Sequence, residues 1–370
     1  MTIRTLAAAA LAMTMPAAAQ PPQAPGATAT APAPVPAPPA SVRAAAILAE
    51  TRVPSVAIAR IENGRIAWAG AWGEQSPGVP ATVSTLYNVA SLSKPISAEI
   101  VLRAASAGRL GIDEPMHPWW VDPDLAADPR HRLLTPRISL THRTGFANWR
   151  RMTDGRLRFD AEPGTRVGYS GEGFEYMARY AERRTGTPFE RLAEELVFRP
   201  AGMADTAYTH RPWFDARLAR PTDKDGNWIE VQRRTAWTAS DEVHTTVLDY
   251  ARFLISVAGR QNLTPAVAAD RERLQVSIRE RQCPPAREAV CPSEVGWGLG
   301  WDLAVFGEDR ILWHTGADRG EWTFAYVVPR TGEGLVILTN NQEGYRAVIR
   351  LLEQVGTHPR FLAYLRALAS

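Results

Sequence analysis

The chain has 370 residues, of which 45% are hydrophobic, a proportion typical of a globular protein that buries one large core or two moderate cores. The formal net charge is only +3, from 42 basic and 39 acidic residues. Because the sequence contains no concentrated basic stripe and no basic segment interleaved with aromatic residues, we expect no binding to nucleic acid.

The first 40 residues have the pattern of an export signal followed by a linker. Arg4 precedes the short apolar run LAAAALAMTM, and three alanines at 17–19 match the cleavage pattern of a secretory signal peptide. The apolar run is too short for a typical membrane span. Proline and alanine then dominate without apolar periodicity, which is typical of an extended, disordered tether. We therefore expect a signal peptide at 1–19, a linker at 20–40, a folded domain at 41–370, no transmembrane segment, and a periplasmic or secreted protein.

Strand patterns occur at both ends of the expected domain. Residues 41–52 predict a helix, and the β-rich run that follows is divided by Asn63-Gly64, a dipeptide that favours a tight hairpin turn. Short β-branched and aromatic runs return at 295–306, 310–316, 322–329 and 334–341, followed by two helical patterns. We expect one antiparallel sheet built from about 41–90 and 295–370, covered by both terminal helices.

The middle of the chain, about 91–294, predicts helices and loops. Helical spacing follows Ser91 and recurs near 171–184, 187–197 and 247–259. We expect a mostly helical second lobe with a cleft between it and the sheet. The predicted fold class is α/β of the α+β type, an antiparallel sheet flanked by helices plus this helical lobe.

The two cysteines, Cys283 and Cys291, are separated by only seven residues. In an exported protein two nearby cysteines are expected to form a disulfide. The seven histidines are scattered, and no metal-binding spacing of histidine or cysteine occurs. We expect no metal and no other cofactor.

Lysine occurs at only two positions, Lys94 and Lys224, whereas every other Lys or Arg position is arginine. A lysine amine can give up its proton in a protein and act as a base, but an arginine guanidinium stays protonated. Ser91 lies three residues before Lys94, so on a helix the hydroxyl and the amine share one face. The spacing predicts a catalytic pair, although these four residues alone are also compatible with an ordinary exposed serine and lysine at a helix start.

Two further stretches extend this pattern. Tyr169 stands just before a predicted helix in EPGTRVGYSGEGFEYMARYAERR, and His314-Thr315-Gly316 ends a predicted strand. Together with ASLSKP, these stretches resemble the three motifs of the serine β-lactamase and penicillin-binding-protein superfamily. They resemble most the branch that holds class C β-lactamases, D-Ala-D-Ala carboxypeptidases, D-aminopeptidases and family VIII esterases. ISLTHRTGF and GWGLGW resemble segments of the same branch, so the resemblance covers about 41–355 and implies a β-lactamase/DD-peptidase-like fold.

The resemblance also implies roles for individual residues. Ser91 would be the nucleophile, and either Lys94 or the phenolate of Tyr169 would take its proton. The backbone N–H groups of Ser91 and Ala317 would stabilise the oxyanion of the tetrahedral intermediate. The strand residues after position 313 would contact the substrate, and these are His314, Thr315 and Gly316.

Two positions depart from the motifs of this branch. The second motif usually reads Tyr-x-Asn, but here Gly171 stands where the asparagine amide would contact the substrate. The third motif of class C β-lactamases begins with lysine, but here it begins with His314. An imidazole with an ordinary pKa of about 6.5 carries only part of a positive charge at pH 7, so we expect weaker binding of a substrate carboxylate.

These patterns predict an exported serine hydrolase that forms an acyl-enzyme. Its expected substrates are small molecules or short peptides, namely small esters, peptides ending in a D-amino acid, or β-lactams that acylate the serine. One alternative is a class C-like β-lactamase. An alternative of a different class is a catalytically idle relative that binds cell-wall peptides or a partner.

Overall fold

The computed structural model describes residues 35–356 and 358–369. The predicted signal peptide and most of the predicted linker, up to residue 34, lie outside the described residues. At the end of the linker, Pro36 O accepts a hydrogen bond of 3.2 Å from Ala69 N in strand β2 (Arg65–Ser76). The chain therefore contacts the sheet a few residues before the expected domain start at residue 41.

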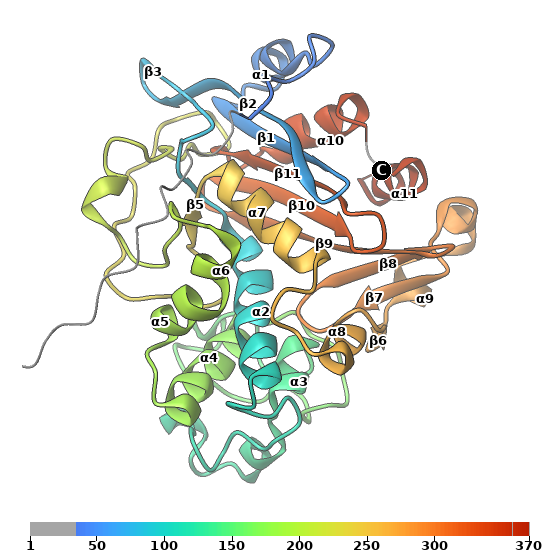
Figure 1. Cartoon of the computed structure of the whole chain (residues 1–370). Coiled ribbons are helices and arrows are strands. Elements are labelled where there is room, and N and C mark those ends of the chain that lie inside the picture. The colour runs from blue at the N-terminus through green and yellow to red at the C-terminus, as the bar shows by residue number, and fades with distance from the viewer. Residues whose placement is uncertain (1–34, 357, 370) are drawn as a thin grey trace, which may run out of the picture. The chain divides into compact units, whose positions relative to one another are not determined.

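One antiparallel sheet joins the two ends of the described chain (Figure 1). Its strand order is β3-β2-β1-β11-β10-β9-β8-β7-β6. Besides β2, its strands are β1 (Ser55–Glu62), β3 (Val79–Pro80), β6 (Val276–Ser277), β7 (Glu294–Trp297), β8 (Asp302–Phe306), β9 (Asp309–Asp318), β10 (Glu321–Val328) and β11 (Glu333–Thr339). Strand β1 pairs with β11, with Val56 opposite Thr339, as expected for an antiparallel sheet of N-terminal and C-terminal strands. Strand β6 differs from the prediction, because it joins this sheet from the segment at about 91–294 that is predicted to form the helical lobe.

The hairpin between β1 and β2 turns at the predicted dipeptide. Asn63 has φ of 51° and Gly64 has φ of 70°, so both residues adopt the left-handed conformation that a type I′ turn requires. This turn sets the first pairs of β1 with β2, and the register then shifts by one residue between Arg60 and Ile61. Strand β1 is in turn paired with β11.

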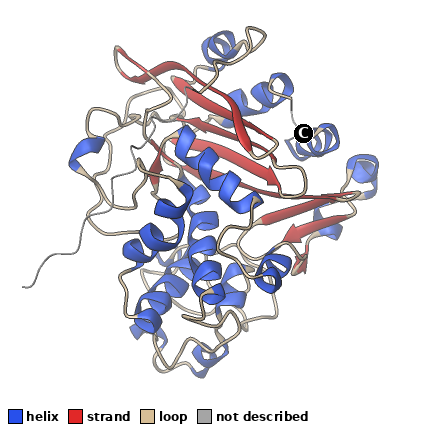
Figure 2. Cartoon of the chain, in the orientation of Figure 1, coloured by secondary structure: helices blue, strands red, loops and turns tan. Residues whose placement is uncertain are grey.

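Each face of the sheet packs against a different set of helices (Figure 2). Val56 and Ile58 of β1 pack in one hydrophobic cluster with the terminal helices, whereas Ala57 and Ala59 pack in a second cluster with the helical lobe. The terminal helices are α1 (Ala44–Thr51), α10 (Tyr345–Gln354) and α11 (Pro359–Ala369), and α7 (Val247–Ala258) lies on the opposite face. Among the described helices, none is both long enough and apolar enough to cross a membrane.

The helical lobe is built around α2 (Ser93–Ser106), which is buried on all sides from Ser93 to Ala104. Around it lie α3 (Pro136–Leu140), α4 (Gly171–Thr185), α5 (Phe189–Ala193), α6 (Arg199–Ala201) and α8 (Pro265–Arg271). The helix predicted at 187–197 differs from the prediction, because it becomes π-helical over Glu194–Phe198 (η5) and ends at Gly202, whose φ is 71°. Because α2 is surrounded by protein, it is a rigid support for the side chains at its start.

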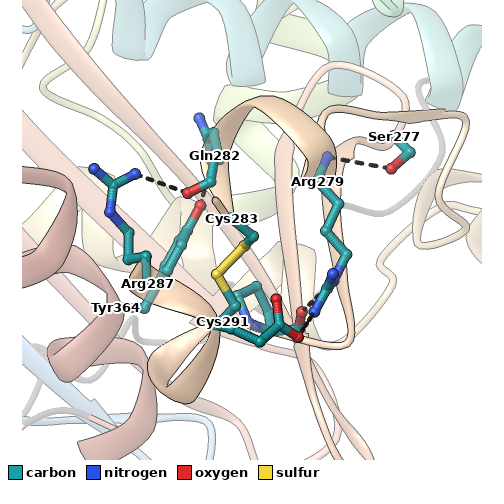
Figure 3. The surroundings of a disulfide bond; sticks show 9 residues. Ser277, Arg279, Gln282, Cys283, Arg287, Cys291 and Tyr364 are labelled. Carbon is teal, nitrogen blue, oxygen red and sulfur yellow. Dashed lines mark hydrogen bonds and ion pairs between the residues drawn. A yellow bond between two sulfur atoms is a disulfide. The ribbon is translucent and has the colours of Figure 1, made fainter. Parts of the chain in front are cut away.

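The predicted disulfide between Cys283 and Cys291 is present, with an S–S distance of 2.03 Å (Figure 3). It closes the loop formed by α9 (Arg279–Gln282) and η7 (Pro285–Val290). The loop is also bound to the C-terminal helix, since the Tyr364 hydroxyl donates to the side-chain oxygen of Gln282. The disulfide therefore stabilises a loop that packs under α11.

Candidate active site

Ser91 and Lys94 lie at the start of the buried helix α2. Ser91 belongs to a single 3₁₀ turn, η1 (Ala90–Leu92), that continues directly into the helix. Lys94 Nζ donates hydrogen bonds to Ser91 Oγ at 2.8 Å and to Ser240 O at 2.9 Å. Lys94 is completely buried and forms no ion pair with any carboxylate in the described part of the chain. The structure thus brings the predicted pair into direct contact.

The backbone just before Ser91 is held in an unusual conformation. Ala90 has φ of 48°, which is uncommon for a residue other than glycine. Asn88 Oδ1 accepts from Ala90 N at 2.9 Å, and Ser93 Oγ donates to Ala90 O at 2.7 Å. Backbone strain of this kind is retained where the surroundings enforce it, and it is frequent at catalytic sites. These two contacts fix the direction in which Ser91 leaves the turn.

Tyr169 lies next to Lys94, between the amine and solvent. The tyrosine is 36% exposed, and the centre of its ring is 4.8 Å from Lys94 Nζ. On its other side the ring packs against His142 at 4.4 Å, and His142 Nδ1 accepts from Ser170 N at 3.1 Å. Burial, followed by the nearby charge of Lys94, lowers the pKa of His142 well below its ordinary value. A neutral His142 therefore accepts from the backbone of Ser170 and packs its ring against Tyr169.

The second partner of Lys94 is Ser240 O, and Glu175 holds Ser240 in place; neither residue belongs to the predicted motifs. Glu175, on α4, accepts hydrogen bonds from Ser240 Oγ at 2.6 Å, Ser240 N at 2.9 Å and Ala239 N at 3.1 Å. Burial raises the pKa of Glu175, and these hydrogen bonds oppose the shift. The carboxyl group fixes the loop that presents Ser240 O to Lys94. Of Glu175 and Ser240, only Glu175 could have been placed near the site from the sequence, because it lies in the predicted helix that follows Tyr169.

Strand β9 passes directly over the nucleophile. Its last five residues extend beyond β8, whose final pair is Asp302 with Trp313. A Cβ atom on Gly316 would lie 2.3 Å from Val89 O and 3.1 Å from Ser91 N. Only glycine permits such an approach between two backbones. Side chains alternate along a strand, so the residues two positions away, at 314 and 318, share the face of β9 that borders Ser91.

His314 is buried beside Tyr169. Its side chain is 3% exposed, its ring centre is 6.2 Å from that of Tyr169, and its Nδ1 lies 2.5 Å from Thr315 O. Burial, followed by the charge of Lys94, lowers the pKa of His314 to about 3. The expectation that this imidazole is partly charged at pH 7 is therefore wrong, and the physical reason is desolvation of the ring. Thr315 is half-buried on the opposite face of the strand, paired with Phe324.

Gly171 begins helix α4 beneath the indole of Trp149. A Cβ atom at position 171 would lie 2.9 Å from the Trp149 ring and 3.1 Å from Ser240 Oγ. The Trp149 ring centre is also 6.0 Å from Lys94 Nζ. The space in which an asparagine amide would begin in the related motif is thus occupied by an aromatic ring.

A cleft of about 800 Å³ opens beside these residues. Its lining includes Asn88, Trp149, Asp241 and Asp318. Asn88 is close in sequence to Ser91, Asp241 to Ser240 and Asp318 to Gly316, and the Trp149 ring contacts Lys94. Within 35–356 and 358–369, no group of three or more His, Cys, Asp or Glu side chains is arranged to hold a metal ion.

The family model described as Beta-lactamase matches residues 42–355. This chain belongs to the β-lactamase family. The similarity to the serine β-lactamase and penicillin-binding-protein superfamily is thereby confirmed, as is the predicted fold class.

Relatives of this β-lactamase-family chain have several activities in their names. Esterase EstB from Burkholderia gladioli is 31% identical over 357 residues, covering 79% of this chain and 87% of EstB. The D-alanyl-D-alanine-carboxypeptidase/endopeptidase AmpH from Escherichia coli K12 is 24% identical over 291 residues, covering 72% of this chain and 74% of AmpH. The crystal structure of D-alanine carboxypeptidase AmpC from Burkholderia cenocepacia has the same fold, with a TM-score of 0.66 at 20% identity over 84% of this chain and 96% of that one.

Proposed function

We propose that this chain is a serine hydrolase that forms an acyl-enzyme on Ser91. The observation that carries the proposal is the 2.8 Å contact between Lys94 Nζ and Ser91 Oγ, made by a fully buried amine without an ion-pair partner among the described residues. A serine hydroxyl becomes a good nucleophile only when an adjacent base removes its proton. The fold, shared with esterases and peptidases, supports the same reaction class.

Acylation and hydrolysis each require a proton transfer at Ser91. The Ser91 oxygen bonds to the carbonyl carbon of the substrate while its proton passes to a base, and the leaving group departs with a proton. Water then attacks the acyl-enzyme and releases the acid and free Ser91. The direct contact with Ser91 favours Lys94 as the first proton acceptor, and Tyr169, between Lys94 and solvent, would return the proton to the leaving group.

The backbone N–H groups of Ser91 and Ala317 are the proposed oxyanion donors. Strands β9 and β10 are joined by a two-residue turn, so Asp318 and Glu321 form the closing pair of the hairpin. In an antiparallel ladder the next pair, Ala317 with Trp322, then directs its N–H groups away from the partner strand. For Ala317 this is the free edge that borders Ser91, which supports its assignment.

The substrate is proposed to be a small ester or a peptide ending in a D-amino acid in preference to a β-lactam. The indole of Trp149 fills the position at which an amide at residue 171 would begin, and His314 is neutral and buried. Losing a neutral hydrogen bond costs about 0.5–1.5 kcal/mol, and losing a charged one about 1.5–3 kcal/mol. Together these losses correspond to a deficit of roughly 30- to 2000-fold in kcat/KM for a β-lactam that relies on both contacts.

Covalent labelling tests the proposal directly. A fluorophosphonate probe and a fluorescent penicillin should label the wild type and should not label Ser91→Ala, and mass spectrometry should place the adduct on Ser91. An adduct on Ser93 would show that the nucleophile is misassigned. Absence of any adduct with either probe would support the idle, peptide-binding alternative.

The kinetic comparison is kcat/KM for p-nitrophenyl butyrate against nitrocefin at pH 7.5. Faster turnover of the ester supports the proposed preference. Nitrocefin turnover that equals or exceeds ester turnover would support the class C-like β-lactamase alternative instead.

Export is the proposed location, because the N-terminal pattern predicts a cleaved signal peptide and the loop at 283–291 contains a disulfide. Fractionation of expressing cells and N-terminal sequencing should find the mature protein beginning near Gln20 outside the cytoplasm. Recovery of the full-length chain in the cytoplasm would contradict this proposal.

A further inference from the structure

The cleft beside Ser91 contains a cluster of carboxylates. Asp318 ends β9 and Glu321 begins β10, and the two residues lie directly opposite each other across the hairpin. Like charges that face each other across a ladder destabilise a sheet. Asp241, which follows the Lys94-binding residue Ser240, also lines the cleft, and electrostatic repulsion links it to both hairpin carboxylates. We call Asp241, Asp318 and Glu321 the acidic triad.

Neither Asp318 nor Glu321 has a partner for its carboxylate among the described residues, but Asp318 is exposed whereas Glu321 is buried. The residue is only 7% exposed and lines the cleft. Its carboxylate makes no hydrogen bond and no ion pair with any residue that the structure describes. Burial, followed by repulsion from Asp318 and Asp241, raises the pKa of Glu321 well above its ordinary value, and burial raises the pKa of Asp241 to about 7. A largely buried carboxylate without a protein partner is costly unless water, an ion or a ligand satisfies it.

The basic residues that line the same cleft do not neutralise the triad. Arg234 donates to Glu242 at 2.7 Å, and the guanidinium of Arg151 lies 5.2 Å from the centre of the Trp149 ring. Arg319, at the turn of the hairpin, is exposed and has no ion pair within the described residues. In addition, the three carboxylates are not arranged as metal ligands. None of these arginines pairs with a member of the triad, and the charge of Lys94 only opposes the rise in the pKa of Asp241. The triad can therefore bind an organic cation.

The triad lies within reach of a substrate bound at Ser91. Asp318 is on the same face of β9 as Gly316, whose Cα borders Ser91 N. Two residues along a strand span about 7 Å. A group attached two or three bonds from the scissile carbonyl covers about a third to a half of this distance. The carboxylate side chains can reach back over the rest.

We propose that the acidic triad binds a protonated primary amine of the substrate, so that the preferred substrates are aminoacyl esters or amides. This inference rests on the proposed serine hydrolase function and names its substrate class. A primary ammonium has three N–H donors and one positive charge, which match several carboxylate oxygens at once. Binding would relieve the repulsion between Asp318 and Glu321 and would give the Glu321 carboxylate a partner, which no described residue supplies.

Two matched pairs of achiral esters test this inference with the full-length protein. Glycine phenyl ester differs from phenyl propionate, and β-alanine phenyl ester from phenyl butyrate, only in having an ammonium group in place of a methyl group. For each pair, kcat/KM of the amine ester is divided by kcat/KM of the neutral ester, and the same ratio is taken for hydroxide-catalysed hydrolysis. In at least one pair the enzymatic ratio should exceed the hydroxide ratio by about tenfold or more, a typical effect of one charged hydrogen bond. Ratios equal to the hydroxide ratios in both pairs would overturn the proposal.

Substitutions then assign the effect to the triad. Glu321→Gln and Asp318→Asn, which keep the shape of each side chain, should each lower the amine-to-neutral ratio by about tenfold. Glu230→Gln is the matched control, since Glu230 lies on another wall of the same cleft and its carboxylate binds Arg220 at 2.7 Å. It should change the ratio less than about twofold, as expected for an exposed, screened charge.

Each outcome of the substitutions bears on the inference separately from the parent proposal. A ratio that stays at the wild-type value in both triad variants would overturn the inference even if both neutral esters are hydrolysed. An equal fall in the Glu230→Gln control would show a general effect of charge and would also overturn it. Failure to hydrolyse the neutral esters, together with the absence of a Ser91 adduct, would instead contradict the parent proposal.

Discussion

Gly316 lies so close to Ser91 that a Cβ atom on the glycine would be 3.1 Å from the serine amide nitrogen. The same atom would be 2.3 Å from Val89 O, which is backbone and cannot turn aside. The Thr323 hydroxyl donates to Val89 O at 2.9 Å and so fixes β10 to the same turn. The width of the proposed oxyanion hole is thus set by contact between two backbones.

Gly316→Ala should therefore lower the acylation rate by about 100-fold, the effect of losing one oxyanion donor. Stopped-flow measurement with a fluorescent penicillin or a p-nitrophenyl ester checks this. Gly168→Ala is the matched control, because a Cβ atom at Gly168 would have no neighbour within 4 Å and its φ is not in the left-handed region. Equal rates for Gly316→Ala and the control would contradict the assignment of β9 to the oxyanion hole.

Lys94→Arg should be nearly as damaging as Lys94→Ala. Arginine keeps the positive charge but cannot accept a proton, so acylation should fall at least about 100-fold, the lower range for loss of a positioned base. The other lysine supplies a control, since Lys224 is exposed and pairs with Asp225 at 2.8 Å. Lys224→Arg should leave the rate unchanged. If Lys94→Arg retained more than a third of the wild-type rate, the proton would pass through another group, and Tyr169 is the nearest candidate.

Gly171→Asn should fail to introduce binding of an acyl-amide substrate. The new side chain would begin 2.9 Å from the Trp149 ring, so we expect a loss of about 1–3 kcal/mol in stability from overpacking. The double variant Gly171→Asn, Trp149→Ala should be more stable than the sum of the two single variants predicts, because removing the ring removes the clash. Urea unfolding of all four proteins measures this coupling. Strict additivity would show that the two positions do not interact.

Glu321→Gln should raise stability increasingly with pH. The raised pKa of Glu321 means that the folded protein holds this proton more tightly than the unfolded chain does. The free energy of unfolding therefore falls as pH rises above about 4.3, the ordinary pKa of glutamate, and glutamine removes this fall. We expect a melting temperature about 1–3 °C higher than wild type at pH 8 and a smaller difference at pH 5. The same increase at both pH values would contradict the assigned cause.

Cys283→Ser, Cys291→Ser should lower the free energy of unfolding by about 2–3 kcal/mol, the loop-entropy value for so short a loop. The melting temperature should fall by about 4 °C for a domain of this size. Because the loop lies away from Ser91 and packs under α11, ester hydrolysis per folded molecule should not change. A loss of activity without a loss of stability would show that the loop influences the site.

The sequence by itself was enough for the features that depend on neighbours along the chain. The spacing of Ser91 and Lys94 predicts their contact because residues three apart share one helix face. Asn63-Gly64 predicts the hairpin because both residues tolerate positive φ. The disulfide is predicted because two cysteines so close in sequence readily pair in an oxidising compartment.

Only the tertiary structure decided the features that depend on burial or on distant segments. Ser240 lies 146 residues from Lys94 in the sequence, and no local pattern marks its carbonyl as an acceptor. The neutrality of His314 depends on desolvation, which is a property of everything packed around the ring. Asp241 joins the two carboxylates of the β9–β10 hairpin only because the chain folds back from the helical lobe. The burial of Glu321 without a partner among the described residues is likewise a property of the tertiary structure.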